Sequence, residues 1–363
     1  MQKTIKAAIC YEFGKPLVIE EVLLDPPQSG EVQVQLTACA ICHSDIHYME
    51  GAWEGVLPAV YGHEAAGVVT EVGPGVTEIV PGDHVVVTLI RSCGRCYYCE
   101  QGQSTQCEAT FALDNETRLH TKAGDPILQA LRTGCFAEAA VVDQSQVVKL
   151  PKAVSMESAS LLACGVITGL GAVVNTAQVP FGSSVVVIGT GGVGLNSIQG
   201  AHLLGAHPLI AIDLLDSKLE AAREFGATHT INVSHEDAIA RVQELTEGRG
   251  ADYVFVTVGS GRAMEQGLSL IRKAGTLVLV GMPASGVKIQ IEAVNFAGNG
   301  QHIIGSKMGS TQLRLDVPKL VALYEEGRLK LDELITERYS LDQINAAIAA
   351  VNRGEALRNV IIF

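Results

Sequence analysis

The chain has 363 residues, and its 26 Lys and Arg against 39 Asp and Glu give a formal net charge of −13. This acidic balance argues against nucleic acid or an anionic membrane as a partner, because both select basic patches. With 47% hydrophobic and 18% charged residues, the composition excludes a disordered chain, and the length favours two domains over one.

The start of the chain shows no secretory signal, because residues 4–8 already predict a strand. The most apolar stretch, 159–174, is short and interrupted by glycines and hydroxyl residues, so it does not predict a membrane span. We therefore expect a cytoplasmic protein with no membrane association. In that setting nine cysteines favour thiol chemistry or metal binding over disulfides.

Residues 1–150 are rich in predicted strands and in Gly and Pro turns. Residues 31–36 alternate apolar and polar, which predicts a strand with one buried face and places Cys42 just beyond its end. His63 lies at the start of another strand, and Cys164 lies in an apolar run. A Cys/His/Cys set with one open position is typical of catalytic zinc. Taken singly, each residue is a weak indication, because a lone cysteine in an apolar run is usually a small core residue and a lone histidine is usually just hydrogen-bonded.

Four further cysteines form the pattern Cys-x2-Cys-x2-Cys-x7-Cys at Cys93, Cys96, Cys99 and Cys107. Tetrahedral zinc takes four thiolates at about 2.3 Å, and short Cys-x2-Cys loops deliver them. No histidine lies in the run, so the site would be closed to water and structural. An iron–sulfur cluster, two disulfides or four unrelated thiols are the alternatives.

A glycine-rich turn follows the uncharged β-branched run 184–188 and precedes an apolar helical pattern over 193–205. Strand, G-x-G-x-x-G turn and helix together predict a dinucleotide-binding unit, in which the glycines admit the pyrophosphate and the helix N-terminus favours its charge. The turn residues that we expect to contact the cofactor are Gly189, Gly191, Gly192, Val193 and Gly194.

Asp213 ends the next predicted strand, 24 residues after Gly189. A carboxylate there accepts from both hydroxyls of the adenosine ribose and repels a 2′-phosphate, so we expect NAD rather than NADP. Asp216 competes for this role but is better explained as a helix N-cap. Lys218 either reaches the adenosine end of the cofactor or is a solvated helix charge.

The remaining pattern alternates helix and strand, which predicts a doubly wound parallel sheet. The expected helices cover 217–225, 235–246 and 262–272, and the expected strands cover 230–233, 251–259 and 275–281. A helix over 151–163 would lead into this domain. At the C-terminal end we expect helices at 318–327 and 341–352 and strands at 335–339 and 357–362, rejoining the first domain.

These motifs together closely resemble the zinc-dependent medium-chain alcohol dehydrogenase family over essentially the whole chain. The resemblance rests on the Cys-His-Ser-Asp loop at 42–45, the Gly-His-Glu run at 62–64, the four-cysteine lobe at about 90–110, the segment 161–175, the GTGGVG turn and the segment 356–360. It implies an α/β protein, with a GroES-like β-rich catalytic domain over 1–160 and 308–363. It also implies a Rossmann NAD-binding domain over 161–307, an active site in the cleft between the domains, two zinc ions per chain and a homodimer.

The resemblance also implies individual roles. Cys42, His63 and Cys164 would hold the catalytic zinc. Ser44 would take the alcohol proton and pass it through the cofactor ribose to His47, whose unperturbed pKa of about 6.5 suits exchange with solvent. The other implied positions are Asp45 as the hydrogen-bond partner of His63, Glu64 as an acid near the zinc or a structural ion pair, His43 and Arg358 on the pyrophosphate, and Thr168 on the nicotinamide.

The substrate is less strongly indicated. Trp53, Leu89 and Met282 match pocket-lining positions of the family and are apolar, which favours a medium-chain or aromatic primary alcohol. S-(hydroxymethyl)glutathione is the alternative, with Arg118 as a loose candidate for holding a glutathione carboxylate. A catalytically dormant nucleotide-binding regulator is the alternative of another class. The complete set of ligand and relay residues argues against it.

Overall fold

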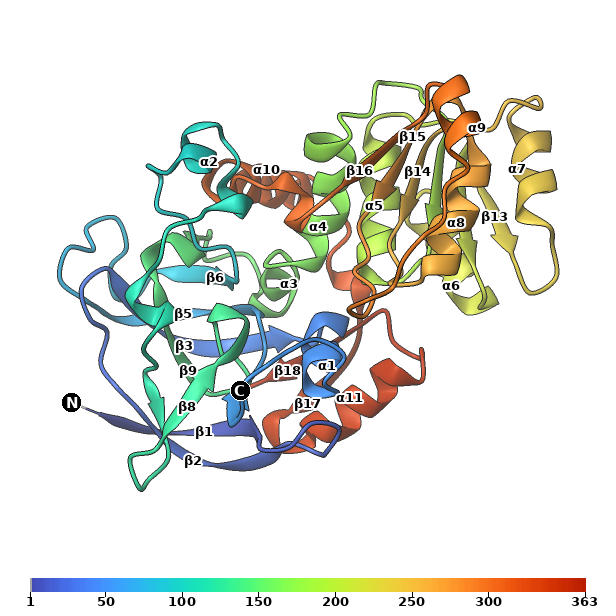
Figure 1. Ribbon diagram of the computed structural model, residues 1–363. Helices are drawn as coiled ribbons and strands as arrows, with labels where there is room; N and C mark the ends of the chain where they lie inside the picture. Colours follow the sequence, from blue (N-terminus) through green and yellow to red (C-terminus); the bar gives the residue numbers. More distant parts are fainter. Residues whose placement is uncertain (1) are drawn as a thin grey trace. The chain divides into compact units, whose positions relative to one another are not determined.

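The computed structural model describes residues 2–363, which divide into two units (Figure 1). The first unit comprises the chain up to Cys164 together with Gln312–Phe363, and the second comprises Gly165–Thr311. The boundaries thus lie at 164/165 and 311/312, a few residues beyond the positions expected from the sequence. Among the described residues, no helix has the length and apolar character needed to cross a bilayer.

The first unit contains a closed barrel and a seven-stranded sheet. The barrel runs in the order β1-β2-β7-β8-β4, with bounds Lys3–Cys10, Val18–Leu24, Leu119–His120, Pro126–Gln129 and Ala59–Val60. The larger sheet runs β10-β6-β5-β3-β18-β17, with bounds Val147–Lys149, His84–Thr88, Glu64–Val72, Glu31–Ala40, Arg358–Ile362 and Ile335–Ser340. β9 (Ala139–Asp143) also pairs with β3.

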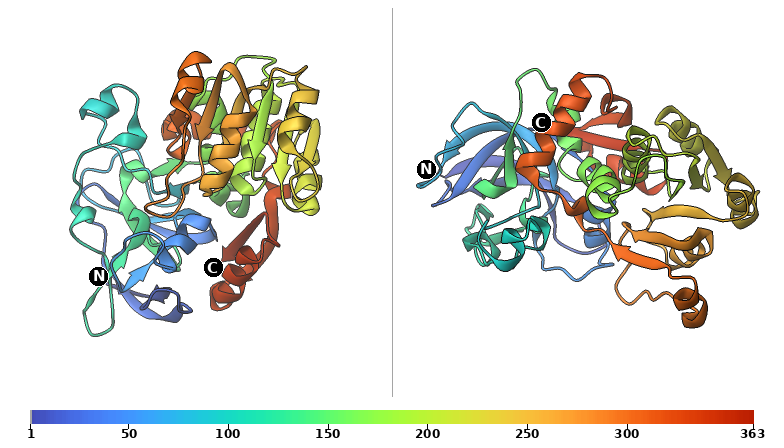
Figure 2. Two further views of the ribbon diagram at one scale, coloured as in Figure 1. Left: turned by 45° about the vertical axis from the view of Figure 1, so that its right-hand side comes forward. Right: turned by 90° about the horizontal axis from the view of Figure 1, so that it is seen from above.

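The C-terminal segment completes this sheet. β18 pairs antiparallel with β3, so the red C-terminal strand joins the sheet that contains the blue strand β3 (Figures 1 and 2). The expected return of the C-terminal part to the strand-rich region therefore has a direct structural basis. It also delivers Arg358, the first residue of β18, next to the strand that leads to Cys42.

The helices of the first unit are few and mostly short. They are α1 (His43–Met49), α2 (Tyr97–Glu100), α3 (Met156–Leu161), α10 (Leu313–Glu325) and α11 (Ile344–Asn352). The expected helix over 151–163 is wrong at its start, because the Ser155 side chain accepts from the Ser158 backbone and caps a helix that begins only at Met156. α10 begins at Leu313 rather than at 318, and Pro318 lies inside it.

The second unit is a six-stranded parallel sheet in the order β13-β12-β11-β14-β15-β16, with helices on its faces (Figure 1). The strands span His229–Asn232, Leu209–Asp213, Val185–Ile188, Ala251–Val256, Ile271–Leu279 and His302–Gly305. The helices are α4 (Gly165–Gly171), α5 (Gly192–Leu203), α6 (Asp216–Glu224), α7 (Ala238–Leu245), α8 (Gly261–Leu270) and α9 (Ala293–Gly298). The sequence order β11-α5-β12 sets the dinucleotide turn at the centre of the sheet.

Two local predictions need correction. β3 is buried on both faces, not one, and Glu31 at its start is only 2% exposed because Arg118 neutralises it. Asp216 is not the N-cap of α6 but its first residue, after Leu215. The Asp216 carboxylate accepts from the Asn232 side chain at 2.6 Å, so the residue ties α6 to β13.

Candidate metal centres and dinucleotide site

Four buried side chains of the first unit converge on one point. Ligand atoms of Cys42, His63, Glu64 and Cys164 all lie within 4.8 Å of one another. Cys42 is the N-cap of α1, two residues beyond β3, and Cys164 follows α3. His63 directly precedes β5. The structure thus gathers residues that are far apart in the sequence.

Gly62 sets the position of His63. It adopts φ +89°, and a Cβ built on it would lie 2.6 Å from both the backbone nitrogen and the ring of Phe136. Only glycine fits this close approach at a positive φ. The neighbouring histidine is therefore fixed by backbone packing as well as by its own side chain.

The His63 ring is held by Asp45. Nδ1 of His63 lies 2.9 Å from Oδ1 of Asp45, which also accepts from the backbone of Gly62 at 2.9 Å. This pairing puts the proton on Nδ1 and leaves Nε2 as a lone-pair donor. Nε2 is buried and has no hydrogen-bond partner among the described residues. A buried ring nitrogen directed at two thiols is what a zinc ion requires, so these residues fit the metal.

The two cysteine thiols of this cluster also have pKa values that their surroundings shift. A hydrogen bond from Cys164, helped by the His63 imidazole, lowers the pKa of Cys42 well below that of an ordinary thiol. The same shared hydrogen bond, together with burial, raises the pKa of Cys164. A divalent cation completes this cluster by displacing the protons that the two thiols and the imidazole hold.

Glu64, the first residue of β5, faces the same centre and forms an ion pair with Arg358. Burial raises the pKa of Glu64 to about 7, although the Arg358 guanidinium opposes this. Burial works against the charge on Arg358, but Glu64 outweighs it and the pKa of Arg358 is raised. The sequence suggested that Glu64 is either an acid near the zinc or a structural ion pair. In the structure the Glu64 carboxylate is paired with Arg358 and also lies among the candidate metal ligands.

The expected relay residues lie on α1. Ser44 and His47 are three residues apart and half-buried, so they share one side of the helix. The His47 ring lies 5.2 Å from the Trp53 ring, and Tyr48 also contacts Trp53 edge-on at 5.0 Å. His43, the first residue of α1, is exposed. The aromatic ring of Trp53 therefore lies beside His47, the expected proton carrier.

The four cysteines of the lobe also come together. The sulfurs of Cys93, Cys96, Cys99 and Cys107 lie within 4.8 Å of one another. Backbone N–H groups point at them, from Cys93 to Cys107 at 3.3 Å and from Arg95 to Cys93 at 3.5 Å. Hydrogen bonds from the backbone of Glu108 and Cys99 lower the pKa of Cys96 to about 6. None of the nine cysteines, all of which are described, forms a disulfide, so four thiolates for a closed tetrahedral zinc fit here.

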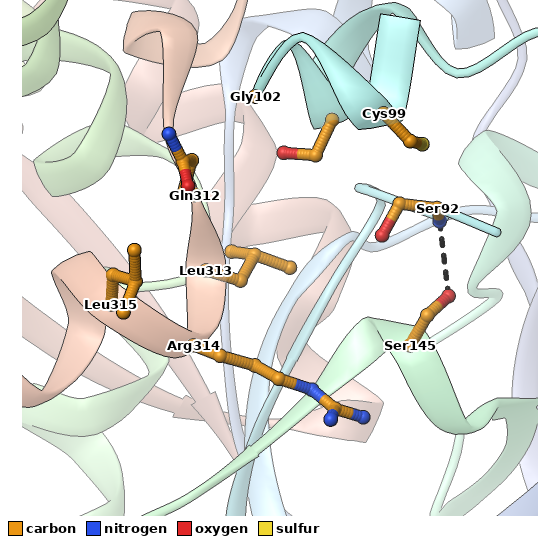
Figure 3. A pocket seen from close by; sticks show the side chains of 9 residues that line it. Ser92, Cys99, Gly102, Ser145, Gln312, Leu313, Arg314 and Leu315 are labelled. Atoms are coloured by element: carbon orange, nitrogen blue, oxygen red, sulfur yellow. Dashed lines mark hydrogen bonds between the residues drawn. The ribbon is translucent and has the colours of Figure 1, made fainter. Parts of the chain in front are cut away.

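A pocket of about 170 Å³ lies beside this lobe and not at the Cys42 centre (Figure 3). Its lining residues are Ser92, Cys99, Gly102, Ser104, Ser145, Gln312, Leu313, Arg314 and Leu315. Two of these lining residues are joined by a hydrogen bond, which the Ser92 backbone donates to the Ser145 hydroxyl at 3.0 Å. Arg314 is engaged by Glu78, so the lining offers no uncommitted cation.

Sequence reasoning missed Arg91, which anchors the base of the lobe. Its fully buried guanidinium donates to Gln146 at 2.8 Å, to Asp114 at 2.9 Å and to the Arg132 carbonyl at 3.2 Å. These partners come from three separate segments. No local pattern could have identified them, because an arginine after a strand is ordinarily exposed.

The dinucleotide turn in the second unit has the geometry that a phosphate requires. A Cβ on Gly194 would lie 1.8 Å from the Gly189 carbonyl oxygen, so glycine is needed there for the helix to approach the strand. A Cβ on Gly191, by contrast, would meet nothing within 4 Å. The open backbone at the N-terminus of α5 fits a pyrophosphate. Gly192 and Val193 are the first two residues of that helix.

Asp213 ends β12 and is bonded to this turn. Its Oδ2 accepts from the backbone nitrogen of Thr190 at 2.7 Å and from the Thr190 hydroxyl at 3.0 Å. Oδ1 accepts from the backbone nitrogens of Leu214 at 2.7 Å and Leu215 at 3.2 Å. Lys218 is half-buried in α6, and Thr168 is buried in α4, where its hydroxyl donates to the Met308 sulfur at 3.7 Å.

The suggestion that Arg118 holds a ligand carboxylate is wrong. Its side chain is 7% exposed and donates twice to Glu31, from Nη2 at 2.7 Å and from Nε at 2.8 Å. Nη1 donates to Glu116 at 2.9 Å. The guanidinium is fully used within the protein, so it is structural.

A GroES-like strand-rich unit with two cysteine-rich clusters that fit zinc, in one chain with a Rossmann unit, is typical of a zinc-dependent nicotinamide oxidoreductase. Residues 28–152 match the alcohol dehydrogenase GroES-like domain, and residues 192–326 match the zinc-binding dehydrogenase domain. The chain belongs to the zinc-dependent medium-chain alcohol dehydrogenase family. This confirms the predicted family, fold class and enzyme type.

Individual relatives cover the whole chain. It is 38% identical to alcohol dehydrogenase class-3 of Cereibacter sphaeroides, over 99% of both chains. It is 36% identical to S-(hydroxymethyl)glutathione dehydrogenase of Paracoccus denitrificans, also over 99% of both. The solved structure of benzyl alcohol dehydrogenase from Acinetobacter calcoaceticus superimposes with a TM-score of 0.94 at 32% identity, over 99% of both chains. The protein is thus a zinc- and NAD(P)-dependent enzyme acting on small alcohols or aldehydes.

Proposed function

We propose that this enzyme interconverts a primary alcohol, aromatic or of medium length, and its aldehyde, with NAD as the hydride carrier. The observation that carries the proposal is the buried Cys42, His63 and Cys164 set, in which Asp45 leaves the His63 lone pair directed at the thiols. Such a set leaves one coordination position for a substrate. The likeness to a benzyl alcohol dehydrogenase and the aromatic ring of Trp53 beside His47 support an aromatic substrate.

The protein's own residues divide the work. Zinc held by Cys42, His63 and Cys164 would supply Lewis acidity, and bound NAD⁺ would supply the hydride acceptor. Ser44 accepts the proton that the alcohol loses, and His47, on the same side of α1 and half-exposed, exchanges it with solvent. Arg358 keeps a positive charge beside Glu64, which limits the negative charge that two thiolates and a carboxylate bring to one point.

Asp213 supports NAD over NADP. Its carboxylate ends β12, where the ribose hydroxyls of adenosine would lie, and a 2′-phosphate there would be repelled. The adjacent residues Leu214 and Leu215 bring no cation to hold a phosphate. We expect the kcat/KM for NAD to exceed that for NADP. The Asp213→Asn variant should have a smaller ratio of the two kcat/KM values. An unchanged ratio would mean that another residue discriminates the two cofactors.

S-(hydroxymethyl)glutathione is the second candidate substrate, favoured by the relative from Paracoccus denitrificans. It is ranked lower because the one basic residue considered for its carboxylates, Arg118, is committed to Glu31. The deciding experiment follows NADH absorbance with NAD⁺ and benzyl alcohol, and separately with NAD⁺, formaldehyde and glutathione. NADH from benzyl alcohol alone supports the proposal, whereas NADH from the glutathione adduct alone overturns the proposed substrate.

We also propose that the protein is a cytoplasmic homodimer. The sheet edge at β16 (His302–Gly305) supports a second copy, because within residues 2–363 this strand pairs only with β15. The chain between the two strands exposes the apolar side chains of Val287, Ile291 and Val294. Light scattering after gel filtration should give twice the 38.3 kDa chain mass. A single-chain mass would refute the dimer.

A further inference from the structure

The carboxylate of Asp213 has no spare acceptor position in this structure. It takes four donors: the backbone nitrogens of Leu214 and Leu215 on Oδ1, and the backbone nitrogen and hydroxyl of Thr190 on Oδ2. A carboxylate offers about four lone-pair sites. Every site that a ribose hydroxyl would use is therefore already filled from within the protein.

The four donors are not equivalent. Three of them are backbone N–H groups, fixed by the end of β12 and by the glycine-rich turn, and they hold the carboxylate in its orientation. The fourth is the Thr190 hydroxyl, 3.0 Å from Oδ2, and it alone can be withdrawn by rotation of a side chain. When a ligand hydroxyl donates to Asp213, this is the bond that gives way.

We propose that the Thr190 hydroxyl is an internal competitor for the ribose hydroxyls of the dinucleotide. The inference rests on the proposed role of Asp213 in ribose recognition. Binding then exchanges one hydrogen bond to the carboxylate for another rather than adding one. The cofactor gains less than a vacant carboxylate would give it, and its release is faster.

Burial makes the exchange costly. The Thr190 side chain is fully buried, whereas Asp213 is half-buried and its neighbour Leu214 is exposed. Water can therefore reach the Asp213 side of the contact more readily than the Thr190 side. A displaced Thr190 hydroxyl loses a bond to a charged acceptor without access to bulk water. Orientation of the carboxylate does not depend on this hydroxyl, because the three backbone donors remain.

The test uses two probes that differ only at the ribose, ADP and 2′,3′-dideoxy-ADP, titrated by calorimetry into the intact enzyme. Wild-type protein should bind ADP only slightly more tightly than the dideoxy probe, because a ribose hydroxyl replaces the Thr190 hydroxyl on the carboxylate. Thr190→Val, which keeps the branched shape but removes the hydroxyl, should bind ADP roughly three- to tenfold more tightly, as one net hydrogen bond implies. The same variant should leave the affinity for 2′,3′-dideoxy-ADP unchanged.

Matched variants complete the design. Thr190→Ser retains the hydroxyl and should behave as wild type, and Thr190→Ala removes it and should follow Thr190→Val. Unchanged binding of the dideoxy probe also shows that the turn is still folded. Weaker or unchanged ADP binding by both hydroxyl-free variants would overturn the competitor role while leaving ribose recognition intact. Equal affinity of the hydroxyl-free variants for the two probes would instead overturn the role of Asp213 itself, because in them nothing competes with the ribose hydroxyls.

Discussion

Replacement of Arg118 by Met tests whether this arginine serves the fold or the substrate. Arg118 and Glu31 are 7% and 3% exposed, and two hydrogen bonds of 2.7 and 2.8 Å join them. Glu31 raises the pKa of Arg118, which shows how strongly the pair favours the charged guanidinium. Without the arginine, the Glu31 carboxylate would stay buried, with the backbone nitrogen of Gln28 at 2.9 Å as a remaining donor.

The expected cost follows from this burial. Removing one partner of a buried ion pair costs about 3–5 kcal/mol, because the other charge is left uncompensated. The matched control is Arg338→Met, since Arg338 and Glu157 form a pair that is 52% and 31% exposed. An exposed pair of this kind contributes about 0–1 kcal/mol. The double variant Glu31→Gln with Arg118→Met removes the stranded charge and should recover much of the loss.

The unfolding of the first unit can be followed specifically. Trp53 is the single tryptophan of the chain and lies in this unit, so its fluorescence in urea reports the unit that contains Arg118. A loss below about 1 kcal/mol for Arg118→Met would refute the buried-pair argument. In parallel, the ratio of turnover with the glutathione adduct to turnover with benzyl alcohol should not change. A selective loss with the adduct would show that Arg118 binds substrate after all.

Three further predictions concern the metal centres. Cys42→Ser should lower bound zinc from two ions to one per chain and abolish turnover; retained activity would contradict the assignment of the catalytic centre. Cys96→Ser should also lose one zinc, yet retain metal at Cys42, and should unfold at lower urea, as measured by Trp53 fluorescence; unchanged stability would mean that the lobe is not structural. Asp45→Asn weakens the partner of His63, so the affinity of the catalytic centre for zinc should fall about tenfold or more, measured by chelator competition. An unaltered zinc affinity would mean that a residue other than Asp45 orients the His63 ring.

The sequence could indicate the lobe and the dinucleotide turn because both are local. All four lobe cysteines lie within 93–107, and the turn follows one strand and opens one helix. In each case the ligand determines the spacing of the residues that hold it, so the spacing alone indicates which ligand is bound. The alternation of helix and strand over the second unit was predictable for a similar reason, since the spacing of apolar residues within each segment indicates its secondary structure.

Features that depend on pairing across the chain were not predictable. Arg358 reaches Glu64 only because β18 joins the sheet beside β3, and Arg118 reaches Glu31 from a loop far along the sequence. The alternation over 31–36 suggested one exposed face, but burial of both faces follows from later segments that cover it. Likewise the helix expected from Pro151 begins only at Met156, because the Ser155 side chain caps it there.

Asp213 shows why a single substitution at a recognised position can mislead. Its carboxylate ties the backbone of Thr190 to the end of β12, in addition to the role in ribose recognition that we propose for it. Asp213→Gly would remove all four of the hydrogen bonds that this carboxylate accepts, so the turn that admits the pyrophosphate would loosen at the same time. The fall in NAD affinity would then combine two effects of similar size, each about one or two hydrogen bonds. Only a comparison in which the ligand hydroxyls are deleted, with the protein unchanged, isolates the contribution of the ribose.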